Sequence, residues 1–262
     1  MALALLLVCS LGLHGAWSVT VGGVGGAALE DRIVARVNLE RRNQGLQPLE
    51  PDPALTRAAR AHSEEMIRLD YFAHESPTPG LRTLSDRMTR VGCTDTEVGE
   101  NLAFYDGLST EVAASRVVDD WLDSPGHRAN LLRSSYTQVG IGVAWGGGRL
   151  TITQTLSSRH VELEPMETRV SSERAVVVLR GRVRATASEV AVFVGDDERG
   201  HATVGEDRRF VAEIVLRPAE RPRALQVGLL AESGPRGPLY QIVSLVPFQG
   251  SGASSGSGAH GR

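Results

Sequence analysis

The sequence contains no lysine, and all 28 of its basic residues are arginine. With 31 acidic residues the formal net charge is −3, which gives no electrostatic reason to expect nucleic acid or an acidic membrane surface as a partner. The hydrophobic fraction of 41% and the charged fraction of 23% are typical of a globular protein. A chain of 262 residues is long enough for one large or two ordinary domains with real cores.

Cysteine is also scarce, since only Cys9 and Cys93 are present. The apolar run around Cys9 is too short to cross a membrane and is typical of a signal peptide, which we place at residues 1–18; the alternative is a buried N-terminal strand. Val8 does not fit a lipoprotein signal, so we expect a secreted or periplasmic protein that does not span the membrane. Cleavage leaves Cys93 alone, which excludes an intramolecular disulfide in the mature chain.

The first half of the chain has a helical period that gives way to a hairpin signal. A flexible spacer is expected at 19–28, and an α+β domain at 29–157. Asp52 and Ser109 are expected to cap the second and fourth of four helices. Three glycines between two alternating segments predict an antiparallel hairpin. The apolar stripes of the four helices are Leu29, Ile33 and Val37; Leu55, Ala59, His62, Met66 and Leu69; Leu84, Met88 and Val91; and Val112, Val117 and Trp121.

The second half contains short runs with a period of two, separated by Gly, Pro and charged turns. This pattern predicts a small all-β, Ig-like sandwich domain at 163–248. We expect the segment HVELEPMET (160–168) to be the linker between the two domains. The Gly- and Ser-rich segment 249–262 is typical of a disordered tail.

Three histidines and one glutamate stand out as candidate site residues. His62 on an apolar helix face is most often a hydrogen-bonded core histidine. His74 follows an aromatic pair, and His127 follows a Ser-Pro-Gly breaker that favours a new helix start, where the helix dipole lowers an imidazole pKa. Glu100 lies among apolar neighbours, where a carboxylate has to be paired or functional.

The order of these motifs resembles a known family. A helix with His62, a loop with His74, the sequence GEN at 99–101 and the sequence SPGHR at 124–128, followed by a hairpin, is similar to the bacterial branch of the CAP superfamily. This superfamily comprises cysteine-rich secretory, antigen 5 and pathogenesis-related proteins. The resemblance covers about half of the chain and implies an α-β-α sandwich with helices on both faces of a central antiparallel sheet.

The resemblance also implies a cleft. Eukaryotic members carry two histidines and two acidic residues there, and some bind zinc or another divalent ion. His74 and Glu100 match the first histidine and the first acid, whereas Ser124 and Ser135 occupy the places of the other two. His127 is the remaining candidate for a second imidazole. His74, His127 and Glu100 suit zinc with an open fourth position, and they equally suit a metal-free hydrogen-bond network.

Three functions follow from this pattern. The first is a secreted, monomeric module whose cleft (His74, Glu100, His127 and His62) binds lipid, peptide or glycan. The second is a hydrolase in which His74, His127 and Glu100 activate water, with or without a metal. The third is a structural wall or matrix protein. We favour the binding module over an enzyme because no nucleophile is evident and the second acid is missing; lone cysteines such as Cys93 are usually core residues.

Overall fold

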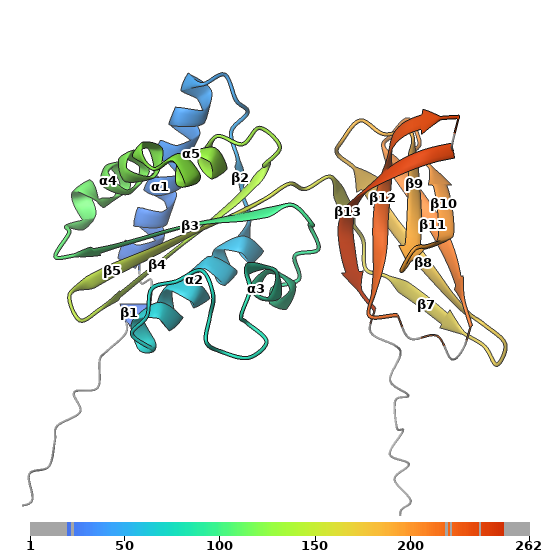
Figure 1. Ribbon diagram of the computed structural model, residues 1–262, viewed down its shortest axis with the longest axis horizontal. Helices are drawn as coiled ribbons and strands as arrows, with labels where there is room; N and C mark the ends of the chain where they lie inside the picture. The colour runs from blue at the N-terminus through green and yellow to red at the C-terminus, as the bar shows by residue number, and fades with distance from the viewer. Residues whose placement is uncertain (1–19, 22–23, 218–219, 221, 236, 249–262) are drawn as a thin grey trace, which may run out of the picture.

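The structure is a computed structural model that describes residues 20–21, 24–217, 220, 222–235 and 237–248. The signal peptide predicted at 1–18 and the tail predicted at 249–262 lie outside the described residues. Figure 1 shows helices on both faces of one sheet in the N-terminal part, and a β-rich part beside it. The predicted combination of an α-β-α sandwich with an all-β C-terminal region is therefore confirmed.

Five helices belong to the N-terminal part. One face of its sheet is covered by α1, α4 and α5, and the opposite face by α2 and α3 (Figure 1). Trp121 is 1% exposed at the centre of the core between the sheet and the first group, and its indole Nε1 donates to Leu102 O at 3.1 Å. The bounds are α1 (Val24–Asn43), α2 (Pro53–Arg68), α3 (Leu84–Arg90), α4 (Thr110–Asp123) and α5 (Pro125–Leu131).

The central sheet has five strands in the order β1-β4-β5-β3, with β2 paired in parallel beside β4. The predicted hairpin is β4 and β5, which turn at Gly147 and Gly148 in the left-handed region. Along β3, alternate residues face opposite sides, so Glu100 and Phe104 share the α2 side while Asn101 faces α5. The bounds are β1 (Thr20–Val21), β2 (Glu50–Pro51), β3 (Val98–Asp106), β4 (Gln138–Gly146) and β5 (Arg149–Ser157).

Helix α2 lies unusually close to β4 because two glycines face it. A Cβ atom on Gly140 would meet the backbone carbon of Leu55 at 2.2 Å, and one on Gly142 would meet the backbone nitrogen of Arg60 at 2.0 Å. The Ser63 hydroxyl donates to Gly142 O at 3.0 Å across the same contact. The cap predicted at Asp52 is present, since its carboxylate accepts from two backbone amides of the first turn. Together these contacts fix the start of α2 and its distance from the sheet.

The β-rich part consists of two four-stranded sheets, β10-β9-β12-β13 and β11-β8-β6 with β7 beside β8. Both sheets contribute to one buried cluster, which includes Val177, Val192, Ile214 and Val227. The bounds are β6 (Val161–Leu163), β7 (Glu167–Val170), β8 (Ala175–Val183), β9 (Glu189–Val194), β10 (Asp197–Thr203), β11 (Arg209–Leu216), β12 (Ala224–Gly234) and β13 (Gly237–Pro247).

Several sequence-based expectations are wrong. Leu69, expected on the apolar stripe of α2, is 41% exposed and is the C-cap residue of that helix. The spacer expected at 19–28 contains the start of α1, where Gly26 packs against Trp145. The linker expected at 160–168 contains β6 and the start of β7, because Val161 is 3% exposed in the β-rich core. Val112 is 52% exposed, so α4 instead buries the stripe Ala113, Ala114, Val117, Val118 and Trp121.

The two parts are joined by backbone pairing as well as by the chain. Asp95 forms an antiparallel bridge with Ser244 of β13, and the amide of Leu245 donates to Thr94 O at 2.8 Å. Arg184, which follows β8, donates to Glu50 Oε2 of β2 at 2.8 Å. Arg159, at the start of the connection, donates to Asp52 Oδ2 at 2.8 Å and lies 3.6 Å from Asp95 Oδ2, which fixes it to the N-terminal part. The segment before β3 therefore extends the edge of the β10-β9-β12-β13 sheet. None of the helices that the structure describes is long and apolar enough to cross a membrane.

Candidate functional site

The carboxylate of Glu100 is held at both oxygens. His74 Nδ1 lies 2.8 Å from Oε1, and Arg87 Nη2 donates to Oε2 at 2.7 Å. The side chains of Glu100 and Arg87 are 3% and 4% exposed, whereas that of His74 is 59% exposed. Arg87 also donates to the backbone oxygen of His74 at 3.0 Å, so one buried guanidinium fixes both partners. The result is an exposed imidazole that is hydrogen-bonded to the carboxylate of a buried ion pair.

His62 lies beneath this pair and is buried. Its Nε2 is 3.1 Å from Ala73 O and 4.0 Å from Glu100 Oε1. Because a carbonyl only accepts, the neutral ring donates from Nε2 and its Nδ1 carries no proton. The hydroxyl of Tyr71 lies 3.4 Å from Nδ1, but its single proton is donated to Glu65. Burial lowers the pKa of His62, in spite of the opposing charge of Glu100. His62 is thus a neutral support for the loop that carries His74, and its side chain is not presented to solvent.

A second buried carboxylate, Glu65, fixes the same loop from α2. Tyr71 donates to its Oε2 at 2.7 Å, and the hydroxyl of Thr78 donates to its Oε1. The loop from Tyr71 to Arg82 is therefore anchored at several points on α2 and α3. A loop held in this way presents His74 with a defined backbone position.

His127 is the third residue of α5, which begins at Pro125 as the Ser-Pro-Gly breaker predicted. The strand β3 is linked to this helix by amides: Asn101 Nδ2 donates to His127 O at 3.2 Å, and Asn130 Nδ2 donates to Glu100 O at 3.1 Å. The ring of His127 is half-buried and makes no hydrogen bond within the part of the chain that the structure describes. Its backbone is fixed, while its ring lacks an orienting partner there.

The two imidazoles differ in protonation. The hydrogen bond to Glu100 raises the pKa of His74 above its ordinary value of 6.5. Burial lowers the pKa of His127, and the charge of His74 lowers it further. This effect of His74 on His127 places the two rings within electrostatic reach of one another. The pair therefore favours one cationic donor, His74, beside one neutral imidazole.

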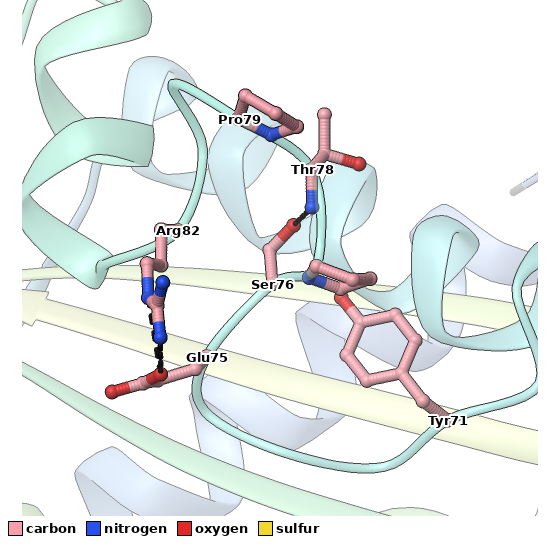
Figure 2. Close-up of a pocket in the computed structure, with 7 residues that line it drawn as sticks. Tyr71, Glu75, Ser76, Thr78, Pro79 and Arg82 are labelled. Atoms are coloured by element: carbon pink, nitrogen blue, oxygen red, sulfur yellow. Dashed lines mark hydrogen bonds and ion pairs between the residues drawn. The ribbon is translucent and has the colours of Figure 1, made fainter.

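Two cavities flank this site. One, of about 460 Å³, is lined by the loop after α2, and Figure 2 shows Arg82 directed at Glu75 on one side and the ring of Tyr71 on the other. The other, of about 290 Å³, lies between α2 and α3 and is lined by His62, Glu65 and Arg87 among others. His74 lines neither cavity, so a ligand of its exposed ring would approach from the open surface.

The donors do not fit a zinc site in this arrangement. Both oxygens of Glu100 and the Nδ1 atom of His74 are already engaged, and the cationic guanidinium of Arg87 lies 2.7 Å from the carboxylate. A divalent ion bound at that carboxylate would be repelled by the buried arginine. No group of three or more His, Cys, Asp or Glu side chains in the described residues could hold a metal ion. Zinc binding by His74, Glu100 and His127 stays a prediction that the geometry does not support.

Arg87 and Glu65 were not found from the sequence. Arg87 lies on a seven-residue helix between the apolar positions Leu84 and Met88, and Glu65 lies between His62 and Met66 on α2. A charged residue on the apolar face of a predicted helix is the signal that would have found them, because a buried charge needs a partner.

The helices on both faces of the sheet and the imidazole on a buried carboxylate at β3 define the class of the N-terminal part. Residues 34–156 match the family described as CAP, the cysteine-rich secretory protein family. This part of the chain is therefore a CAP domain, and the resemblance drawn from the GEN and SPGHR motifs is confirmed.

Two curated relatives come from Bacillus subtilis (strain 168). The uncharacterized protein YkwD is 37% identical over 121 residues, which are 46% of this chain and 44% of YkwD. The uncharacterized membrane protein YlbC is 37% identical over 114 residues, which are 44% of this chain and 31% of YlbC. The chain thus spans less than half the length of either relative.

Solved structures are similar over the same part. An extracellular protein containing a SCP domain from Bacillus anthracis is 30% identical with a TM-score of 0.45, covering 51% of this chain and 41% of that one. An outer surface protein from Borrelia burgdorferi is 19% identical with a TM-score of 0.44, covering 50% of this chain and 93% of that one.

Proposed function

We propose that the CAP domain is a ligand-binding module of an exported protein, and that the ligand is recognised at the exposed ring of His74. The observation that carries this proposal is the contrast between the 59% exposed His74 and the 3% exposed Glu100 that holds it at 2.8 Å. Since Nδ1 is engaged, the ring presents Nε2–H to the surface. A cationic N–H fixed in this way is a strong donor to a carbonyl, hydroxyl or carboxylate oxygen of a ligand.

Binding is favoured over hydrolysis by the state of the candidate catalytic groups. His74 has a raised pKa, so its protonated form is favoured and it is a poor general base. His127 has a lowered pKa, but its ring has no orienting partner in the described residues, whereas a catalytic base is normally held by a third group. Burial raises the pKa of the Cys93 thiol to about 12, which removes it as a nucleophile at neutral pH.

We further propose that the β-rich part is an Ig-like domain that attaches the CAP domain to a partner or a surface outside the cell. Its separate core cluster supports an independent unit. Export rests on the leader predicted at 1–18.

The test compares binding with turnover. Pools of peptides, esters and glycans are incubated with the wild type, with His74→Ala and with His201→Ala, whose histidine lies far away on β10 and serves as the matched control. We expect compounds that are retained unchanged by the wild type and by His201→Ala, and lost by His74→Ala. If a product forms and its formation requires His74, the protein is a hydrolase and not a binding module. If the wild type retains none of the compounds and forms no product, the structural wall or matrix function is the one that remains.

A further inference from the structure

Two exposed phenylalanines form a pair beside the His74–Glu100 contact. Phe72 and Phe104 are 42% and 41% exposed, and their rings meet edge to face with centroids 4.8 Å apart. The guanidinium of Arg149 lies 4.7 Å from the centroid of Phe104. Aromatic residues make up only 5% of this chain, so two large rings left in solvent and touching each other mark a binding surface.

The pair is aligned with the candidate site along β3. Phe104 and Glu100 lie on the same face of this strand four residues apart, which is about 13 Å. In the loop that crosses them, Phe72 touches Phe104 and His74 touches Glu100. The loop and the strand therefore display the exposed imidazole and the exposed rings in one line.

A cavity of about 520 Å³ continues this line at the end of the sheet. It begins at Arg149, the residue stacked on Phe104, and it lies between the end of α2 and the β4–β5 turn. Glycines 146 and 147 leave its sheet side without side chains. We use the name aromatic surface for the set formed by His74, Phe72, Phe104 and the residues that line this cavity. The cavity is lined by Met66, Ile67, Arg68, Leu69, Asp70, Asp106, Gly146, Gly147 and Arg149.

We infer that the aromatic surface binds a linear, uncharged glycan, an inference that rests on the proposed ligand-binding function of the His74 site. Along β3 the surface extends from Glu100 to Asp106, about 20 Å. This length suits a chain of several sugar units better than a single small molecule. One part of the chain would lie on the rings while another meets the Nε2–H of His74.

The chemistry of the surface matches a sugar chain on two counts. The exposed parts of the Phe72 and Phe104 rings offer apolar area for the C–H face of a pyranose ring. The cavity beyond them carries two arginines and two aspartates, with Arg149 Nε donating to Asp106 Oδ1 at 3.1 Å. Arginines only donate and aspartates only accept, whereas sugar hydroxyls do both, so the rim can satisfy hydroxyls of either orientation.

Other ligand classes fit the surface less well. The balance of two positive and two negative side chains gives no cationic cluster for phosphates, which disfavours phospholipid head groups and nucleic acids. An acyl chain would leave the four charged side chains of the cavity facing hydrocarbon, which is costly. A peptide would need its backbone groups paired, and the β3 carbonyls of Glu100 and Leu102 already accept from Asn130 and Trp121.

The experiment measures equilibrium binding of chitohexaose and cellohexaose by calorimetry. Egg phosphatidylcholine vesicles and a Gly-Ser peptide of similar length are the other probes. The variants are Phe72→Ala/Phe104→Ala, the ring-retaining Phe72→Tyr/Phe104→Tyr, His74→Ala, and Phe193→Ala on β9 as the matched control. Circular dichroism melts of each variant verify folding. If the alanine variant unfolds, Phe72→Leu/Phe104→Leu keeps the test decisive, because it removes the rings but retains apolar volume and should lose binding to the same extent.

We expect the wild type to bind at least one hexasaccharide. The double alanine variant should bind this sugar with an affinity reduced by about tenfold or more. The tyrosine variant and Phe193→Ala should bind as the wild type does. The inference is overturned if neither sugar binds, if the rings can be removed without loss, or if only vesicles or peptide bind through Phe72 and Phe104. Ring-dependent sugar binding that is unchanged in His74→Ala would support the aromatic surface and contradict the proposed His74 site. Binding that requires His74 but not the rings would do the reverse.

Discussion

Nδ1 of His74 lies 2.8 Å from Oε1 of Glu100, and this contact joins a largely exposed imidazole to a buried carboxylate. The geometry favours the protonated form of the imidazole, because the hydrogen bond to Glu100 raises the pKa of His74. It also makes the protonation state of the site dependent on one residue of β3, since the hydrogen bond to Glu100 is the largest cause of the raised pKa of His74.

The first prediction concerns that pKa. In an NMR titration of the imidazole signals, His74 should titrate above 6.5, and Glu100→Gln should shift its midpoint down because the charged acceptor is gone. A folded-state pKa above the unfolded value means that the pair stabilises the fold fully below pH 6.5 and that this contribution is lost as the pH rises through the folded pKa. A His74 midpoint that is the same in the wild type and in Glu100→Gln would contradict the hydrogen bond.

The second prediction concerns Arg87. Its side chain and that of Glu100 are 4% and 3% exposed, so removing the guanidinium leaves Oε2 of a buried carboxylate without its partner and His74 as the remaining one. Arg87→Leu should therefore lower the free energy of unfolding by about 3 to 5 kcal/mol in urea. The double variant Arg87→Leu/Glu100→Leu should recover much of this loss, because the unpaired charge is removed as well. Equal destabilisation by the single and double variants would show that packing, and not the charge, is responsible.

Several features of the fold could be predicted from local signals. The Asp52–Pro53 start of α2, the Pro125 start of α5 and the glycine turn of the β4–β5 hairpin depend on the capping and turn chemistry of a few neighbouring residues. The start of α1 was missed because it depends on Gly26 meeting Trp145 of a distant strand. Tertiary contacts of this kind override local preference and leave no trace in a short window.

The residues of the candidate site can also be divided into those that the sequence predicts and those that it does not. His74 and Glu100 were found because the loop motif and the GEN motif resemble those of a family, and the structure brings the two side chains together. Arg87, which holds both, was missed because its partner Glu100 lies on β3, and the sequence does not show that these two side chains meet. His62 was predicted on the apolar stripe of α2, and its burial follows from that position.

The third prediction concerns zinc. Because Arg87 occupies one oxygen of Glu100 and His74 the other, we expect calorimetric titration at neutral pH to show no zinc binding that is lost in both His74→Ala and His127→Ala. Zinc binding that disappears in both variants while His201→Ala retains it would restore the metal site. It would also require Arg87 to release the carboxylate, which a crystal structure with bound zinc would reveal.

The fourth prediction concerns the junction between the two parts, which we propose to be independently folded units. Ser158 is fully buried and Val161 belongs to the β-rich core, so a protease should not cut first between these residues. Glu164 and Pro165 are exposed between β6 and β7. Limited proteolysis with proteinase K should therefore cut first at about residues 164–166 and leave two resistant fragments.

The fragments should stay associated after that cut, since Asp95 and Thr94 pair with β13, β6 pairs with β8, and Arg184 bonds to Glu50. Arg184→Ala removes the ion pairs to Glu50 and Glu162, both of which lie on the N-terminal side of the cut. In gel filtration after proteolysis, the fragments of the wild type should elute together, and those of Arg184→Ala should separate more readily. Arg169→Ala, an exposed arginine on β7 that contacts Glu167, is the matched control and should behave as the wild type. A first cut inside 158–163, or one resistant fragment that spans the junction, would contradict the proposed two units.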